Sequence, residues 1–269
     1  MPTVGPYVFS ATDASRTFSN LGMWWDHLSA GIDAAPATHH GERLAGALAA
    51  AVDASFVAGT NLCDSLGTLG RATAAHIAGN EDTPEAVALL TDVWNSLRNA
   101  MATLRESGAI CTEGSGSVAR INVSNGGVPK LAVQRADVGF RGVIGDRQGS
   151  RQHHGRPWQA LCLWSHEVIS GFARDGHPIA PGCAGENLTV SSLDWSAVRP
   201  GMLLRIGTAL AETSSWAIPC RHNAQWFTDG DFNRMSHERG PIARVYATVL
   251  EPGVVHTGDP VIVIGHQNR

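Results

Sequence analysis

Cys220 is the residue whose type and neighbours are best suited to chemistry. It lies in the segment Ser214-Ser-Trp-Ala-Ile-Pro-Cys-Arg-His-Asn, directly after the strand-like residues 209–214. Pro219 cannot continue a strand ladder, so we expect Cys220 where a strand gives way to a loop. Arg221 and His222 follow, and positive charge beside a thiol favours the thiolate, the form that reacts and binds metals. These residues alone leave open a reactive thiol or a small buried hydrophobic residue.

The other four cysteines give no comparable signal. Cys63, Cys111 and Cys183 lack charged neighbours of this kind, and Cys162 lies in the apolar run Ala-Leu-Cys-Leu-Trp. An odd number of irregularly spaced cysteines without a C-x-x-C pair predicts neither a disulfide framework nor a zinc site. We therefore interpret these four as structural and expect a reducing, cytoplasmic compartment.

A second chemical signal is the polar stretch 145–155, Gly-Asp-Arg-Gln-Gly-Ser-Arg-Gln-His-His-Gly. Together with Arg156 it concentrates arginine and histidine side chains between glycines, as an anion-binding loop does, although a solvated loop has the same composition. His153 and His154 are adjacent and would point to opposite faces of a strand, which argues against a histidine-bound metal. Gly185-Glu-Asn-Leu precedes another strand-like segment, where it could orient a polar ligand or cap a turn.

Composition limits the classes of function. The chain has 269 residues, of which 43% are hydrophobic and 16% charged, and its formal net charge is −4. This balance argues against a broad nucleic-acid-binding surface. No signal peptide and no apolar run long enough for a membrane span are apparent. The common P-loop, G-x-G-x-x-G and G-x-S-x-G signatures are also absent.

The two parts of the chain have different textures. Residues 1–110 are rich in Ala and Leu at helical spacing, and Thr83-Pro84-Glu85 is typical of a helix start before an apolar stripe from Val87 to Leu104. We predict a small helical bundle there, followed by a Gly- and Ser-rich linker over residues 111–118.

Residues 119–269 contain short β-branched segments separated by turn residues. Strands are expected at residues 118–123, 143–144, 188–190, 203–206, 243–250 and 261–264, and a short helix at residues 166–173. The predicted class is α+β: a C-terminal β-barrel with short helices, preceded by the N-terminal helical bundle.

Several short motifs, in one order, resemble the MOSC domain, named for the C-terminal domain of molybdenum cofactor sulfurases. They are Ile121-Asn-Val-Ser-Asn-Gly-Gly-Val-Pro-Lys, Gly145-Asp-Arg-Gln, His154-Gly155 with Pro157 and Ala160-Leu161, Gly185-Glu-Asn-Leu, Pro219-Cys220, and Arg244-Val-Tyr-Ala-Thr-Val-Leu-Glu-Pro-Gly. The chain departs from the family pattern at Arg156 and Trp158 after His154-Gly155, and at Ile242-Ala243, where relatives have Trp-Ser.

The resemblance implies a β-barrel around a cleft that holds Cys220. In such proteins the cysteine ligates the molybdenum of a bound molybdenum cofactor (molybdopterin) or handles sulfur, and the small bacterial members reduce N-hydroxylated compounds. A thiolate suits molybdenum, while the cofactor's phosphate and pterin need cationic and amide groups. The residues that the resemblance suggests for cofactor binding are Lys130, Arg147, His154, Asn187, Arg221, Asn223 and Arg244.

Three functions follow from this resemblance. The first is a molybdenum-cofactor enzyme that reduces N-hydroxylated or N-oxygenated substrates, with Cys220 as catalytic residue and metal ligand. The second is a metal-free sulfur-transfer enzyme that uses a Cys220 thiolate or persulfide. The third is a non-catalytic cofactor carrier. We expect a small-molecule substrate and an external electron donor or sulfur donor protein, but no nucleic acid or membrane; a homodimer is left open.

Overall fold

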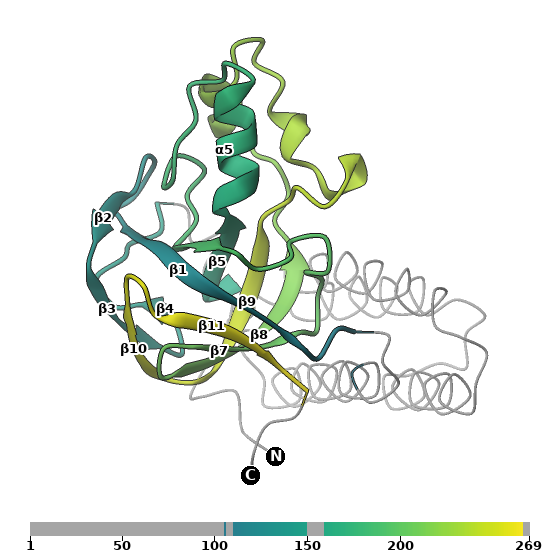
Figure 1. Ribbon diagram of the computed structural model, residues 1–269. Helices are drawn as coiled ribbons and strands as arrows, with labels where there is room; N and C mark the ends of the chain where they lie inside the picture. Colours follow the sequence, from purple (N-terminus) through teal and green to yellow (C-terminus); the bar gives the residue numbers. More distant parts are fainter. Residues whose placement is uncertain (1–104, 106–109, 150–158, 266–269) are drawn as a thin grey trace, which may run out of the picture. The chain divides into compact units, whose positions relative to one another are not determined.

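The computed structural model describes residues 105, 110–149 and 159–265. The helical bundle predicted for residues 1–110 lies almost entirely outside these residues, so it and the division into domains stay predictions. Within the described residues, strands and short helices form the expected strand-rich C-terminal fold, which confirms this part of the α+β class (Figure 1).

Seven strands form a closed barrel. They are β1 (Gly114–Val123), β5 (Leu161–Ser165), β6 (Leu188–Ser191), β7 (Leu203–Ile206), β8 (Ala209–Trp216), β9 (Val245–Glu251) and β11 (Pro260–Ile264). The hydrogen-bonded order is β11-β7-β8-β9-β5-β6-β1, and β1 pairs again with β11, which closes the sheet. β5 and β6 are parallel, whereas the other neighbours are antiparallel.

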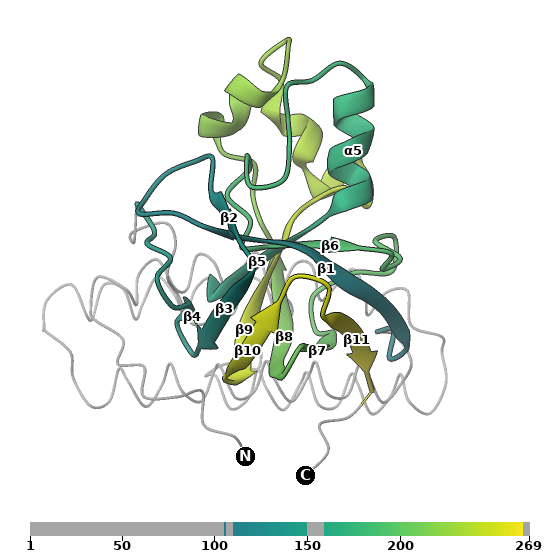
Figure 2. The same cartoon turned by 60° about the vertical axis from the view of Figure 1, so that its left-hand side comes forward.

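Four further strands lie outside this ring. β2 (Leu131–Val133) pairs with the end of β1, and β10 (Gly253–His256), β3 (Arg135–Gly139) and β4 (Gly142–Val143) form a separate three-stranded sheet. Figure 2 shows this small sheet beside the barrel. The sequence analysis did not single out β2, β3, β5 or β10, because these strands are short or lack a clear alternation of apolar and polar residues.

Barrel closure corrects the predicted linker. β1 begins at Gly114, so residues 114–118 belong to the barrel rather than to a linker over 111–118. Gly and Ser suit this strand because the neighbouring strand β6 approaches it closely: a Cβ on Gly116 would lie 2.5 Å from the carbonyl oxygen of Ser191. Here small residues mark close packing between strands, and not only flexibility.

Short helices lie together at one end of the barrel (Figures 1 and 2). Helix α5 (His166–Arg174) agrees with the predicted helix, and its N-cap Ser165 accepts hydrogen bonds from the backbone of Glu167 and Val168. The segment between β8 and β9 contains the 3-10 helices η2 (Arg221–Trp226), η3 (Phe232–Met235) and η4 (His237–Arg239). This segment carries Cys220 to that end of the barrel. Within the described ranges, no helix is long and apolar enough to span a membrane.

We predict that Gly182→Ala destabilises the domain more than Gly176→Ala does. Both glycines have φ +89, which disfavours a side chain, but a Cβ at Gly182 would also lie 2.5 Å from the Lys130 carbonyl oxygen, whereas a Cβ at Gly176 would meet nothing within 4 Å. The conformational cost should be about 1 kcal/mol at each position, with about 2 kcal/mol more at Gly182. Urea unfolding of the two variants measures the difference. Equal losses would show that the loop moves away from Lys130 at little cost.

Candidate functional site

A cavity of about 540 Å³ opens beside the segment that carries Cys220. This volume falls within the range of about 300–1,000 Å³ that is usual for small-molecule sites. The predicted site residues among its described lining are Lys130, Arg147, Asn187, Cys220, Asn223 and Arg244. These residues are far apart in the sequence, and the barrel brings them together as expected.

Cys220 lies at the start of η2, where the chain has left β8. It is the N-cap residue of η2 and is half-buried, and its carbonyl oxygen accepts a 2.8 Å hydrogen bond from the backbone of Asn223. This short helix turns buried Asn223 toward the same cavity. His222 also lines the cavity, whereas exposed Arg221 is not among the described lining residues.

Asp146 is not among the described lining residues, but it binds two residues that are, Lys130 and Asn187. Its Oδ2 accepts hydrogen bonds from Lys130 Nζ at 2.5 Å and from Asn187 Nδ2 at 2.8 Å, and its Oδ1 accepts one from the backbone of Ser124 at 2.7 Å. The Lys130 and Asp146 side chains are only 9% and 5% exposed, so water can replace these contacts only poorly. One carboxylate therefore joins three separate segments of the chain.

Asn187 extends this network to the floor of the cavity. While its Nδ2 donates to Asp146, its Oδ1 accepts a hydrogen bond from the backbone of Cys162 at 3.2 Å. Lys130 and Asn187 thus line the cavity with polar groups that are already engaged. They define its shape and offset the charge of Asp146.

Arg244 has a different environment. It is 6% exposed, and its guanidinium donates to the carbonyl oxygens of Ala184 and Ile218, the latter at 3.4 Å. Its Nε is buried without a hydrogen-bond partner among the described residues, and no described carboxylate lies within salt-bridge distance. Carbonyl groups orient the guanidinium but do not neutralise it, so Arg244 brings a positive charge to the cavity, although the buried carboxyl group of Glu186 is near enough to interact with it electrostatically.

A second thiol, Cys162, also lines the cavity. The sequence analysis interprets it as structural, and it is indeed buried, packed with Ala217 and Tyr246. Burial raises the pKa of the Cys162 thiol to about 11, although the charge of Arg244 lowers it in part. Burial also raises the pKa of the neighbouring Tyr246 hydroxyl. Both groups therefore stay protonated at neutral pH.

Glu186, of the Gly-Glu-Asn-Leu motif, supports the loop behind the cavity. It is fully buried, and its Oε1 accepts hydrogen bonds from the backbone of Gly182 at 2.5 Å and from the Thr189 hydroxyl at 3.1 Å. Burial raises its pKa, and these hydrogen bonds lower it in part. Its role is to hold the loop that presents the Ala184 carbonyl to Arg244.

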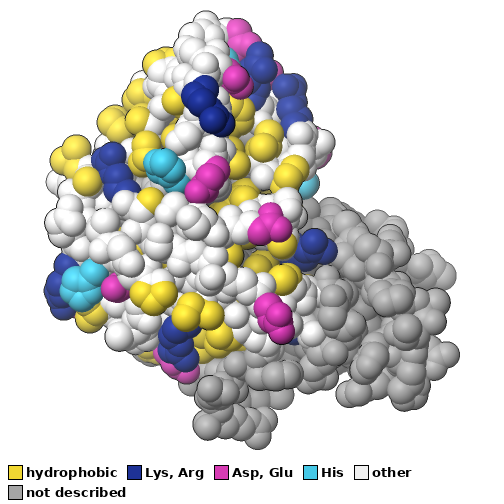
Figure 3. Space-filling model, viewed as in Figure 1, with side chains coloured by type: hydrophobic (Ala, Val, Ile, Leu, Met, Phe, Trp, Pro, Cys, Tyr) yellow, Lys and Arg dark blue, Asp and Glu magenta, His cyan; other side chains and the backbone are white. Residues whose placement is uncertain are grey.

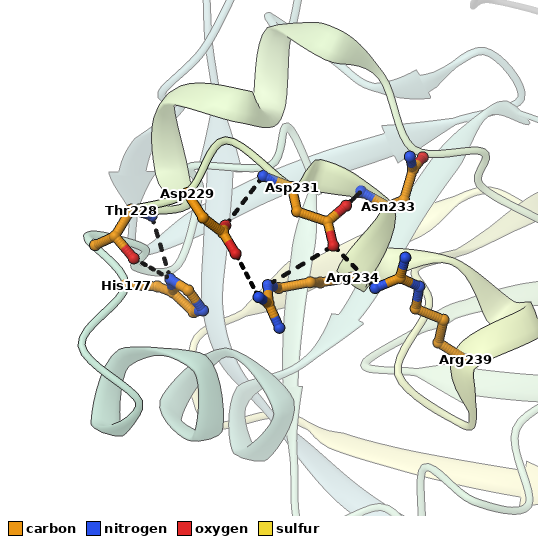
Figure 4. A network of polar contacts seen from close by, with 7 residues as sticks. All are labelled: His177, Thr228, Asp229, Asp231, Asn233, Arg234 and Arg239. Atoms are coloured by element: carbon orange, nitrogen blue, oxygen red, sulfur yellow. Dashed lines mark hydrogen bonds and ion pairs between the residues drawn. The ribbon is translucent and has the colours of Figure 1, made fainter.

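Exposed ion pairs and aromatic contacts brace the segment that follows Cys220. Figure 4 shows Asp229 paired with Arg234, and Asp231 paired with Arg239 at 2.9 Å. Figure 3 shows that acidic and basic side chains also lie side by side at this end of the domain. Exposed pairs of this kind contribute little individually, so they order the segment mainly as a network.

The aromatic part of this brace connects the segment to helix α5. Phe227 packs edge-on against Phe172, with ring centroids 5.4 Å apart, and His177 Nδ1 lies 3.2 Å from the Thr228 hydroxyl. These contacts fix the far end of η2, whose near end carries Cys220.

The structure leaves one predicted site residue untested and adds others. His154 lies outside the described residues. Asp146, Cys162, Ile218 and Tyr246 line the cavity or order it, although sequence reasoning did not select them. Asp146 belongs to a motif that was noted for its arginine, and Tyr246 faces Cys162 across the β5–β9 pairing. Within the described part of the chain, no cluster of three or more His, Cys, Asp or Glu side chains could hold a metal ion.

We predict that Asp146→Ala lowers the free energy of unfolding by about 3 kcal/mol, because it leaves the Lys130 charge buried and unpaired. Asp137→Ala is the matched control, since its ion pair with Arg135 is about half exposed, and it should change stability little. Chemical denaturation measures both variants. A similar small loss in both would mean that water reaches Lys130 freely.

We also predict selective alkylation of the two cavity thiols. At about pH 8 iodoacetamide should modify Cys220 well before Cys162, because burial keeps Cys162 protonated and covered. Peptide mass spectrometry follows each site, and unfolded protein provides the control in which both should react. Equal labelling in the folded protein would contradict the geometry of the cavity.

Comparisons with known proteins show what this chain is similar to. Protein YiiM of Escherichia coli (strain K12) is 30% identical over 128 residues, which are 46% of this chain and 56% of that protein. The chain thus spans about half the length of this curated relative. A crystal structure of YiiM from E. coli shares 24% identity and covers 57% of this chain and 72% of its own, with a TM-score of 0.44.

A second solved structure, the YuaD protein from Bacillus subtilis, shares 18% identity with a TM-score of 0.47, covering 58% of this chain and 98% of its own. The family model named "MOSC domain" matches residues 150–262. The matched range contains Cys220, Asn187 and Arg244, while Lys130 and Arg147 precede it. This match confirms the resemblance suggested by the motifs: residues 150–262 of this chain match the model of the MOSC domain.

Proposed function

We propose that the cavity binds a molybdenum cofactor and that Cys220 ligates its metal, in an enzyme that reduces N-hydroxylated or N-oxygenated substrates. Arg244 carries this proposal. It is a buried cation with an unpartnered Nε, it lies in the same cavity as Cys220, and its partners are carbonyl oxygens rather than a carboxylate. A buried charge of this kind is stabilised when an anionic ligand binds beside it.

The donor set fits the chemistry of the cofactor. Its phosphate would be held by Arg244 and by exposed Arg147, and its pterin by amide groups such as Asn223. Cys220 would provide the soft sulfur ligand. Because the described residues offer no cluster of metal ligands, the remaining metal ligands would come from the cofactor itself.

When bound, the cofactor supplies two-electron redox chemistry. Two electrons and two protons convert an N–OH group into N–H and release water. The chain shows no flavin, haem or iron–sulfur signature, so the electrons would come from an external donor protein. The chain's own residues would bind and orient: Arg244 and Arg147 hold the anion, and Asp146 keeps the surrounding loops together.

A metal-free sulfur-transfer reaction is the second candidate, and the accessibility of Cys220 in the cavity favours it. In that case the Cys220 thiolate attacks the outer sulfur of a donor persulfide, which forms a Cys220 persulfide and releases the donor thiolate. An acceptor thiolate then attacks the outer sulfur and releases the Cys220 thiolate. Arg244 would bind an anionic donor or acceptor. The same purified protein distinguishes the two candidates, since the first retains molybdenum and the second gains sulfur on Cys220.

The test is elemental analysis of the full-length chain purified from a host that makes the cofactor. We expect near-stoichiometric molybdenum in the wild type, its loss in Cys220→Ser, and its retention in Cys111→Ser, because Cys111 does not belong to the described cavity lining. Wild type without molybdenum, or Cys220→Ser that keeps it, would refute the proposal. A mass increase of one sulfur atom on Cys220 in metal-free protein would establish the sulfur-transfer candidate instead.

A further inference from the structure

Two buried tryptophans hold the main chain directly before Arg244. The indole Nε1 of Trp164 donates a 2.8 Å hydrogen bond to the carbonyl oxygen of Ile242, and that of Trp195 donates a 2.9 Å hydrogen bond to the carbonyl oxygen of Ala243. The two side chains are 0% and 6% exposed. Consecutive carbonyls thus each have a dedicated side-chain donor.

The donors come from unrelated parts of the fold. Trp164 belongs to β5, and Trp195 lies between β6 and β7, at sequence separations of 78 and 48 residues from their acceptors. The next carbonyl, of Arg244 itself, accepts a 2.8 Å hydrogen bond from the backbone of Ala217. Three successive carbonyls are therefore fixed before β9 begins at Val245.

Such fixing matters most for a side chain like Arg244. An arginine side chain has several rotatable bonds, so the position of its guanidinium depends on how firmly its backbone is held. The guanidinium is then oriented by the Ala184 and Ile218 carbonyls, which themselves lie in loops. Movement of the Ile242–Ala243 backbone would move the charge away from these groups and from the cavity.

An indole N–H group in this domain does not always have a hydrogen-bond partner. The Nε1 of Trp226, a partly buried residue, has no hydrogen-bond partner in the described structure. The hydrogen bonds of Trp164 and Trp195 therefore fix the position of the main chain in a way that the packing of an aromatic ring does not. They are made to main-chain carbonyls, so they do not depend on the side chains of residues 242 and 243.

We propose that Trp164 and Trp195 are positioning residues that hold Arg244 in place to bind the anionic group of the ligand. This inference rests on the proposed function, in which Arg244 binds that anion. Its consequence is that removal of either indole N–H weakens anion binding even where the aromatic ring is retained.

The test titrates inorganic phosphate into the full-length chain by isothermal calorimetry, well below the melting temperature of each variant. Arg244→Gln should abolish binding. Trp164→Phe and Trp195→Phe should each lower the affinity about fivefold, the effect of losing one ordinary hydrogen bond. Trp226→Phe is the matched control and should bind as the wild type does, because its indole nitrogen has no partner to lose.

The outcomes separate the two claims. If Arg244→Gln binds phosphate as the wild type does, the anion site of the proposed function is wrong. If Arg244→Gln loses binding while both Trp→Phe variants keep it and only melt at lower temperature, the tryptophans are merely structural and this inference is overturned. Should a Phe variant fail to fold, benzothienylalanine at the same position keeps the shape of the ring, removes only the N–H group, and must give the same fivefold loss.

Discussion

The carboxylate of Asp146 is the contact on which the shape of the cavity depends. It accepts hydrogen bonds from Lys130 and the backbone of Ser124, which share the loop between β1 and β2, and from Asn187, so that with its own segment it joins three parts of the chain. A carboxylate and an ammonium group that are both withdrawn from water are stable only while they stay together. The loops before β2, before β6 and after β4 are therefore held in one arrangement, and the cavity lies between them.

This arrangement leaves a simple distribution of charge. Lys130 is neutralised by Asp146, and Asn187 is engaged at both ends of its amide, whereas Arg244 meets only carbonyl oxygens and keeps its charge. Cys220 lies in the same cavity, at the start of a short helix that follows β8. A fixed cation and an accessible thiol in one small-molecule cavity suit a ligand that combines an anionic group with a centre that binds sulfur. The molybdenum cofactor has both of these features, which is why we propose it as the ligand.

Local patterns predicted the barrel and the place of Cys220 well. Cys220 follows β8, which ends at Trp216, by four residues, and short β-branched segments gave the positions of β6, β7 and β11 because their side chains alternate or are mostly buried. The motifs also gathered most of the cavity lining. What the sequence could not reveal are contacts between distant segments: Asp146 with Asn187, 41 residues away, and the indole of Trp164 with the Ile242 carbonyl, 78 residues away. Such contacts depend on strand order, which no short window contains.

The most direct test of the central claim is a crystal structure of the full-length protein, purified from a host that makes the cofactor, with anomalous data at the molybdenum edge. The account predicts an anomalous peak within bonding distance of Cys220 Sγ and phosphate density beside the guanidinium of Arg244. A molybdenum peak elsewhere, or a cavity in which Cys220 bears only an added sulfur atom, would contradict it.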